Sequence, residues 1–270
     1  MSAPPKLINP DALLRNRARA RRREPALFLH EEAVLEVQER LNQVNRRFTQ
    51  PAVITAWSEV WAKLLPEARI VADADRLDLG VEAHDLIIHA MALHWSDDPV
   101  GQLIQCLRAL RPDGLLIAVL PGGRTLHELR ASLAEAESAL YSGLSPRVLP
   151  MGEIRDLGGL LGRAGFALPV ADAVALRASY RDLPHLAHDL RAMGEGNALA
   201  ARSHRFSRAL FDEAGRIYRD NYPADSGRIA ATFELIFLTG WAPHPDQQKP
   251  LRPGSAVARL ADALNASPTD

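Results

Sequence analysis

The chain has 270 residues, of which 47% are hydrophobic and 24% are charged, and its formal net charge is −1. A balance so close to zero excludes a general attraction to nucleic acid or to acidic membranes, and no stretch approaches the roughly 20 apolar residues of a membrane-spanning helix. The N-terminus lacks an apolar run after its charges, so we expect neither export nor membrane insertion. The predicted location is the cytoplasm, or the mitochondrial matrix if the source is eukaryotic.

The first predicted element is a basic N-terminal arm and helix over residues 1–45. Arginines crowd residues 15–23, and Asp11 before them is a suitable helix N-cap. We interpret this run as a solvated arm or helix face, with docking on an acidic protein surface or contact with phosphates as alternatives. Apolar residues at helical spacing predict a helix over 27–41, which we expect to cover an open edge of the following sheet.

Residues 46–170 have the pattern of an α/β core. Apolar runs predict strands at 52–55, 68–72, 84–88 and 115–120, and the segments between them predict helices at 56–65 and 99–110. Strands that alternate with helices require a parallel sheet covered by helices, because each crossover packs its apolar face back on the strands. The single cysteine, Cys106, falls in the second of these helices and is interpreted as a core residue.

The rest of the chain is expected to complete the same domain over residues 171–270. Before it, helices are predicted at 125–140 and at 152–164, and Gly165 is a natural left-handed cap for the second. Past Val170 strands are hard to find, and residues 183–220 read as largely helical. The proline-rich run from Pro243 predicts an extended wrap and a frayed tail.

Two motifs in the middle of the chain carry a family resemblance. Residues 85–95 (DLIIHAMALHW) begin a strand with an acid and place His-Trp after it, and residues 110–114 (LRPDG) precede another strand. Together they resemble the stretch from the fourth to the fifth strand of class I S-adenosylmethionine (SAM) methyltransferases. Further motifs lie at residues 122–130 (GGRTLHELR), 156–166 (DLGGLLGRAGF), 189–197 (DLRAMGEGN) and 240–244 (GWAPH).

Those further motifs resemble two families within the superfamily. One is the mitochondrial complex I assembly factor that hydroxylates an arginine, and the other is the biotin-pathway malonyl-carrier-protein methyltransferase. The resemblance covers residues 80–258 and implies a Rossmann-like sheet with helical C-terminal additions. It implies a bacterial counterpart that uses SAM to modify an arginine of a complex I subunit. A factor that binds its client without SAM, or a regulatory subunit that pairs with an active homologue, remains an alternative.

The resemblance fails in the first half of the cofactor site. Such enzymes carry a glycine-rich loop after the first strand, so that the backbone can approach the cofactor. Here the first strand is followed by Trp57 and Trp61, and no glycine occurs before Gly80. Only about 30 residues separate that strand from Asp85, where two βα units of roughly 30 residues each are usual. The sequence therefore predicts a shortened N-terminal half, whose bulky side chains occupy space that the cofactor needs.

Candidates for cofactor contact follow the predicted strands: Thr55, Asp73, Asp75, His89 and His94. An acid after the second strand accepts hydrogen bonds from ribose or adenine, although Asp73 and Asp75 can equally be solvated or capping residues. His94 comes where the class places residues beside adenine or methionine. A structural role is the alternative for His94, and His89 has the same two interpretations.

Candidates for substrate contact lie further along the chain: Gly122, Gly123, Arg124, Glu128, Glu195 and Asn197. The two glycines form a turn where ligands bind in open α/β sheets. Glu128 either pairs with Arg124 one helical turn away or clamps a substrate arginine, and Glu195 and Asn197 share the second possibility. No residue is identified as catalytic. The nine histidines lack the spacing of metal ligands, so no metal is expected.

Overall fold

The computed structural model describes residues 6–201 and 206–247, and one seven-stranded sheet forms its centre. The strand order is β2-β1-β3-β4-β7-β5, with β6 paired to β7. The strands are β1 (Pro51–Ile54), β2 (Arg69–Val71), β3 (His84–Ala90), β4 (Leu110–Pro121), β5 (Ala167–Tyr180), β6 (Pro223–Ala224) and β7 (Arg228–Trp241). The helices are α1 (Pro10–Arg21), α2 (Phe28–Gln43), α3 (Ser58–Leu64), η1 (Leu93–Trp95), α4 (Pro99–Ala109), α5 (His127–Tyr141), α6 (Ile154–Ala164), α7 (Leu183–Ala192), α8 (Arg208–Asn221) and η2 (Asp225–Gly227).

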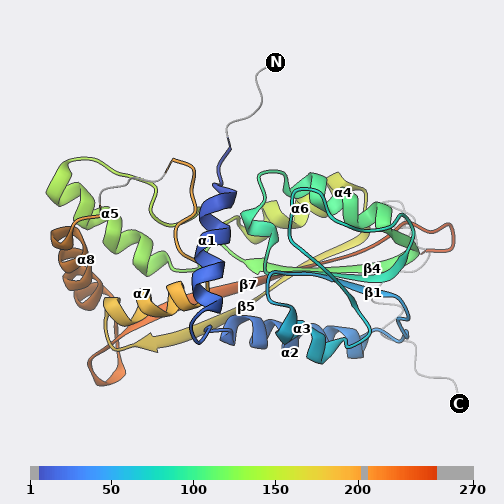
Figure 1. Ribbon diagram of the computed structural model, residues 1–270, viewed down its shortest axis with the longest axis horizontal. Helices are drawn as coiled ribbons and strands as arrows, with labels where there is room; N and C mark the ends of the chain where they lie inside the picture. The colour runs from blue at the N-terminus through green and yellow to red at the C-terminus, as the bar shows by residue number, and fades with distance from the viewer. Residues whose placement is uncertain (1–5, 202–205, 248–270) are drawn as a thin grey trace, which may run out of the picture.

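Helices cover both faces of the sheet, as its sequence pattern predicts. Figure 1 shows α4 and α6 on one face and α2 and α3 on the other, with α1 between these layers and the group of α5, α7 and α8. Successive residues of β3 point to opposite faces. Leu86 and Ile88 join the core that contains Ala33 of α2, whereas Ile87 joins the core that contains Leu103 of α4. The α/β class is confirmed.

The strands do not all run the same way. The strands β2, β1, β3 and β4 are parallel, whereas β7 is antiparallel to both β4 and β5. Every residue of β3 is buried, because a parallel strand between two helical layers has no face toward water. The sheet is therefore mixed, with its parallel part in the N-terminal half.

The N-terminal half lacks one βα unit, as predicted. The chain passes from β2 to β3 through residues 72–83, which hold no helix, and β2 is left at the sheet edge with Ile70 39% exposed. The expectation that helix 27–41 covers this edge is wrong. Ala33 and Val37 of α2 pack in the core against Val53 of β1, so the helix covers a face of the sheet.

The expectation that strands end near Val170 is also wrong. Both β5 and β7 have 14 residues. The strand β5 contains many alanines, which favour helix over strand, and β7 is a largely buried apolar run whose periodicity does not distinguish strand from helix. The helical prediction for 183–220 is met by α7 and α8. The predicted tail lies mostly at residues 248–270, outside the described residues.

The residues at the helix ends contradict one predicted cap and confirm another. The N-cap of α1 is Asn9, whose Oδ1 accepts from the Ala12 amide at 3.0 Å, so the prediction of Asp11 as the cap is wrong. Gly165 closes α6 with a φ of 95°, as expected.

Cys106 is buried, and this burial raises its pKa to about 12. No helix in the described ranges is long and apolar enough to cross a membrane.

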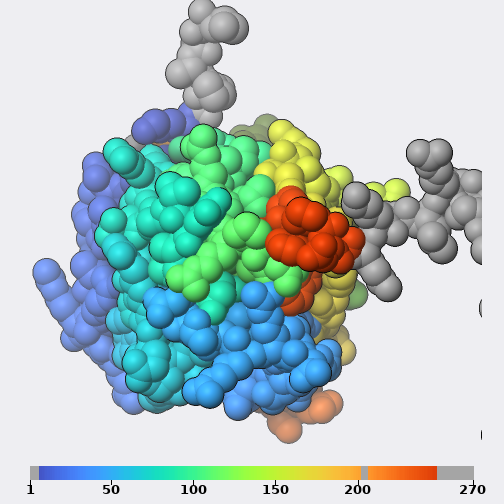
Figure 2. Space-filling view, turned by 90° about the vertical axis from the view of Figure 1, so that its right-hand side faces the viewer, coloured from blue at the N-terminus to red at the C-terminus, as the bar shows by residue number. Residues whose placement is uncertain are grey.

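Polar contacts join the segments at the amino ends of the parallel strands. Arg46, before β1, forms an ion pair with Asp113 of β4 at 2.8 Å. Gln247, after β7, donates to the other oxygen of Asp113 at 2.9 Å. Figure 2 shows these three segments meeting, in blue, green and red. One aspartate thus joins the two halves of the sheet at this end.

Candidate functional site

A pocket of about 580 Å³ opens at the carboxyl ends of β3 and β4, where ligands bind in open α/β sheets. Met91, directly after β3, and Pro121, the last residue of β4, both line it. Helices α1, α2, α5, α7 and α8 contribute the remaining walls, together with β7 and the loops beside them. The polar side chains that line the pocket are Asn16, Arg19, His30, His94, Trp95, Thr125, Arg147, Arg191, Glu195 and Asn197.

Glu195 is the acidic side chain of this pocket. Its Oε2 accepts from Trp95 Nε1 at 2.6 Å and lies 3.3 Å from His94 Nε2. Its other oxygen, Oε1, has no hydrogen bond within the described ranges. Burial alone would raise the pKa of Glu195, but the hydrogen bond and charge of His94, with Arg17 and Trp95, outweigh it and lower the pKa. The carboxylate is therefore ionised at neutral pH and has one oxygen available to a ligand.

His94 lies beside Glu195 and is almost completely buried. Its side chain is only 4% exposed, and its Nδ1 is buried without a hydrogen-bond partner in the described part of the chain. A buried polar atom without a partner costs free energy. His94 was predicted as a cofactor contact and Glu195 as a substrate contact, but the structure brings the two into one pocket. The fold joins them although they are 101 residues apart.

Asn197 lies in the same pocket, two residues after Glu195. Its Oδ1 accepts from the Leu199 amide at 2.9 Å, and its Nδ2 donates to the Pro146 carbonyl at 3.3 Å. These bonds hold the loop after α7 against the segment after α5. Asn197 therefore shapes the pocket beside Glu195.

Two pocket residues have left-handed backbone conformations that ordinary side chains rarely adopt. The φ angle is 54° at Met91 and 52° at Leu126. Each conformation costs roughly 1 kcal/mol in a residue other than glycine. The Met91 amide donates to Val119 and the Leu126 amide donates to Thr232, each at 2.8 Å, which keeps both residues in place. Such strain concentrates at binding sites, where it positions the walls.

His30 is a pocket residue that the sequence did not reveal. It is buried on α2, and its Nδ1 accepts from Trp61 Nε1 at 3.2 Å. Burial lowers the pKa of His30 to about 4, so the ring is neutral at physiological pH. Its position on the buried face of an amphipathic helix was the available signal.

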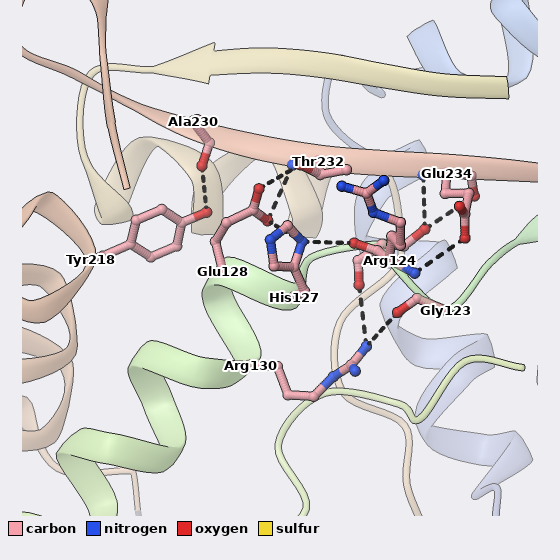
Figure 3. Close-up of polar contacts among 10 residues, drawn as sticks. Gly123, Arg124, His127, Glu128, Arg130, Tyr218, Ala230, Thr232 and Glu234 are labelled. Atoms are coloured by element: carbon pink, nitrogen blue, oxygen red, sulfur yellow. Dashed lines mark hydrogen bonds and ion pairs between the residues drawn. The ribbon is translucent and has the colours of Figure 1, made fainter. Parts of the chain in front are cut away.

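The predicted substrate residues after β4 form a separate structural cluster, shown in Figure 3. Glu128 is buried, and its carboxylate accepts from Thr232 Oγ1 at 2.5 Å and from the Thr232 amide at 3.2 Å. The predicted ion pair between Glu128 and Arg124 is absent. Arg124 is exposed, and its backbone amide donates to Glu234 at 3.2 Å. These contacts attach the start of α5 to β7.

The glycine turn belongs to that cluster as well. A Cβ atom on Gly122 would lie 2.5 Å from Glu234 Oε2 and from Ile236, so a larger residue here would displace these two side chains of β7. The carbonyl of Gly123 accepts from Arg130 at 3.4 Å. Neither these two glycines nor Arg124 and Glu128 are among the residues that line the pocket. Their proposed contact with substrate has no support from this geometry.

The place expected for SAM, at the carboxyl ends of β1 and β2, is filled by α1. Arg17 of α1 forms an ion pair with Asp73 at 2.5 Å, and the two side chains are 4% and 14% exposed. Arg21 donates to the Ala56 carbonyl, and its guanidinium lies 5.0 Å from the centre of the Trp57 ring. Trp57 is itself 1% exposed. Side chains of the protein therefore take up this crevice.

The described residues do not fit SAM while α1 is in this position. The acid expected to hold the ribose, Asp73, is neutralised by Arg17, and Thr55 is buried with its hydroxyl accepting from the Trp57 amide at 3.1 Å. Sequence reasoning missed Arg17 because it was counted with the solvated arginines. The sequence feature that could have shown Arg17 to be buried is its place on the same helical face as the small apolar Ala20.

The other predicted cofactor residues lie elsewhere. Asp75 is exposed, and its carbonyl accepts from Gln105 at 2.9 Å. His89 is fully buried, and its Nε2 donates to Gln102 Oε1 at 2.7 Å, while burial lowers its pKa. Both contacts join α4 to the sheet region. Within the described ranges, no group of three His, Cys, Asp or Glu side chains is arranged to hold a metal ion.

Comparisons with known proteins point to the same methyltransferase fold as the strand order does. Residues 35–118 match the methyltransferase domain family model. The chain is 35% identical over 198 residues to the arginine-hydroxylase NDUFAF5, mitochondrial, of Danio rerio, covering 73% of this chain and 62% of that protein. It is 32% identical over 191 residues to the malonyl-[acyl-carrier protein] O-methyltransferase of Laribacter hongkongensis, covering 70% of this chain and 62% of that protein.

One solved structure with a similar trace is the YcgJ protein of Bacillus subtilis, with a TM-score of 0.49, 12% identity and coverage of 80% of this chain and 100% of that one. The fold assignment rests on the strand order instead. The matches span less than two thirds of the length of the NDUFAF5 relatives in fish, rat and mouse. With the motifs, the sheet and the sequence relatives in agreement, the chain belongs to the class I SAM-dependent methyltransferase superfamily.

Proposed function

We propose that this protein acts in the assembly of respiratory complex I and modifies an arginine side chain of a client subunit held in the pocket. The observation that carries the proposal is the ionised carboxylate of Glu195, with one oxygen open, in a mainly apolar pocket. The relatives named arginine-hydroxylase support arginine as the target. We propose the role in complex I assembly because the sequence motifs resemble those of the mitochondrial complex I assembly factor.

The pocket offers a guanidinium what it needs for binding. Glu195 Oε1 accepts an N–H from the arginine in a charge-assisted hydrogen bond, which is roughly twice as strong as a neutral one. The indole of Trp95 provides an aromatic surface of the kind on which guanidinium groups stack. Apolar walls exclude water and strengthen these contacts. The residues thus bind and orient the client side chain.

The proposal also concerns which cofactor the protein uses. Membership of the superfamily supports SAM as the cofactor, and α1 must then leave the crevice before SAM can enter, because Arg17 holds Asp73. The same ion pair is the observation that favours the alternative, a factor that binds its client without SAM. The relatives named as hydroxylases favour the enzyme. We therefore propose an enzyme whose structure here shows the cofactor crevice closed.

The proposal is tested in cells from which the gene has been removed and restored as wild type or as a variant. Complex I subunits are isolated and their arginines mapped by peptide mass spectrometry. We expect an arginine with an added oxygen or methyl group in cells with the wild type, and its loss with Glu195→Gln, which keeps the side-chain shape but removes the charge. The control is Glu135→Gln, on the exposed face of α5. Unmodified arginines in wild-type cells contradict the proposed reaction.

A further inference from the structure

The pocket is larger and more apolar than an arginine side chain alone requires. Its volume of about 580 Å³ is in the range of sites for drug-sized ligands. Apolar side chains from α5, α7, α8 and β7 form much of its wall, namely Leu129, Leu133, Leu183, Leu190, Phe211 and Phe233. None of them offers a hydrogen bond. A single guanidinium at Glu195 leaves this wall without a partner.

The apolar wall continues onto the surface at Phe206. This ring lines the pocket, is 50% exposed and lies 5.7 Å from the ring of Phe211. Exposed aromatic side chains beside an apolar pocket are typical of surfaces that a partner covers. The guanidinium of Arg147 stacks over Phe206 at 5.1 Å and holds the ring at the pocket. The wall is thus accessible to a side chain that enters from solution.

The charges at this pocket select among possible occupants. Glu195 requires a cationic or hydrogen-bond-donating group. Arg19 and Arg191 are exposed, so water screens their repulsion of a cation, and the buried charge of Arg147 is paired with Glu137 at 2.6 Å. We infer that the client segment carries a large apolar side chain directly beside its arginine. The arginine pairs with Glu195 and the apolar side chain fills the space between α5, α7 and Phe206. This inference rests on the proposed function, because it takes the client arginine as given.

The test is fluorescence anisotropy of labelled ten-residue peptides with the full chain. One peptide has leucine and phenylalanine on either side of a central arginine, and a second has serines there. Two more peptides repeat these with citrulline, the neutral analogue of arginine. We expect the apolar neighbours to tighten binding of the arginine peptide at least tenfold. We also expect Phe206→Ser to remove most of that gain, whereas Leu35→Ser, at an exposed leucine of α2 outside the pocket, leaves it unchanged.

The outcomes separate the inference from the proposed function. If arginine binds better than citrulline but its neighbours change the affinity less than twofold, the inference is overturned and the proposed function stands. Equal binding of arginine and citrulline overturns both. A dansylated fatty acid tests the other occupant that the exposed arginines would suit. Displacement of this probe by the apolar arginine peptide supports the inference, and tight binding that no peptide displaces overturns it. Thermal unfolding of each variant verifies that it is folded.

Discussion

Buried titratable side chains give the pocket its chemistry at the scale of single residues. Glu195 stays charged because His94, Arg17 and Trp95 together lower its pKa, whereas His30 stays neutral because burial lowers its pKa. One ionised acceptor in a mainly apolar pocket is what a cationic ligand requires. The same burial couples the stability of the protein to pH, since each shifted group binds protons differently in the folded and unfolded chain.

His30 leads to a prediction about acid stability. The unfolded chain protonates this histidine near pH 6.5, but the folded chain does so only near pH 4. Its contribution is therefore complete above pH 6.5 and is lost as the pH falls toward 4. Urea unfolding at several pH values should show the wild type losing about 2–3 kcal/mol more than His30→Asn over this interval. The control is His188→Asn, at an exposed position of α7. If the free energy of unfolding changes equally with pH in His30→Asn and the wild type, this prediction is wrong.

At the scale of elements, α1 occupies the crevice that the superfamily uses for its cofactor. Its inner face carries Ala12, Leu13 and Ala20 together with Arg17, and this one charged residue reaches Asp73 after β2. The outer face carries the remaining arginines of the basic run. Removing one partner of a buried ion pair leaves the other charge uncompensated, which destabilises the contact. Arg17 is accordingly the residue that holds α1 in place.

Replacing Arg17 tests this role of α1. We expect Arg17→Ala to cost about 3–5 kcal/mol of stability and to raise hydrogen exchange in α1, measured by mass spectrometry. Arg15→Ala, on the exposed face of the same helix, should change neither quantity. With α1 loosened, S-adenosylhomocysteine should bind Arg17→Ala at least tenfold more tightly than the wild type in calorimetric titration. Identical exchange and identical binding in both variants would show that α1 does not close the crevice.

At the scale of the whole molecule, a closed crevice and an open pocket lie next to each other at the carboxyl end of the sheet. The crevice beyond β1 and β2 is closed by α1, and the pocket beyond β3 and β4 is open. The missing βα unit between β2 and β3 shortens the half of the sheet that contains β1 and β2. The other half keeps long strands, including the antiparallel β7 between β4 and β5.

Sequence alone could predict the parallel part of this architecture, because β1, β3 and β4 are short apolar runs separated by helical segments. It also showed the missing unit, since spacing along the chain is directly visible. It missed β5, whose alanines favour helix, and β7, a long apolar run whose periodicity does not distinguish strand from helix. It separated His94 from Glu195, and counted Arg17 as solvated, because these contacts form only when distant elements pack.

The central claim is that Glu195 receives the client arginine, and a double-mutant cycle tests it most directly. Wild type and Glu195→Gln are each titrated with the arginine peptide and its citrulline analogue, with Glu135→Gln as the matched control. The account predicts a coupling of at least about 1.4 kcal/mol, a tenfold effect, for Glu195, and none for Glu135. Equal weakening of both peptides by Glu195→Gln would show that the carboxylate and the arginine do not interact, and would contradict the account.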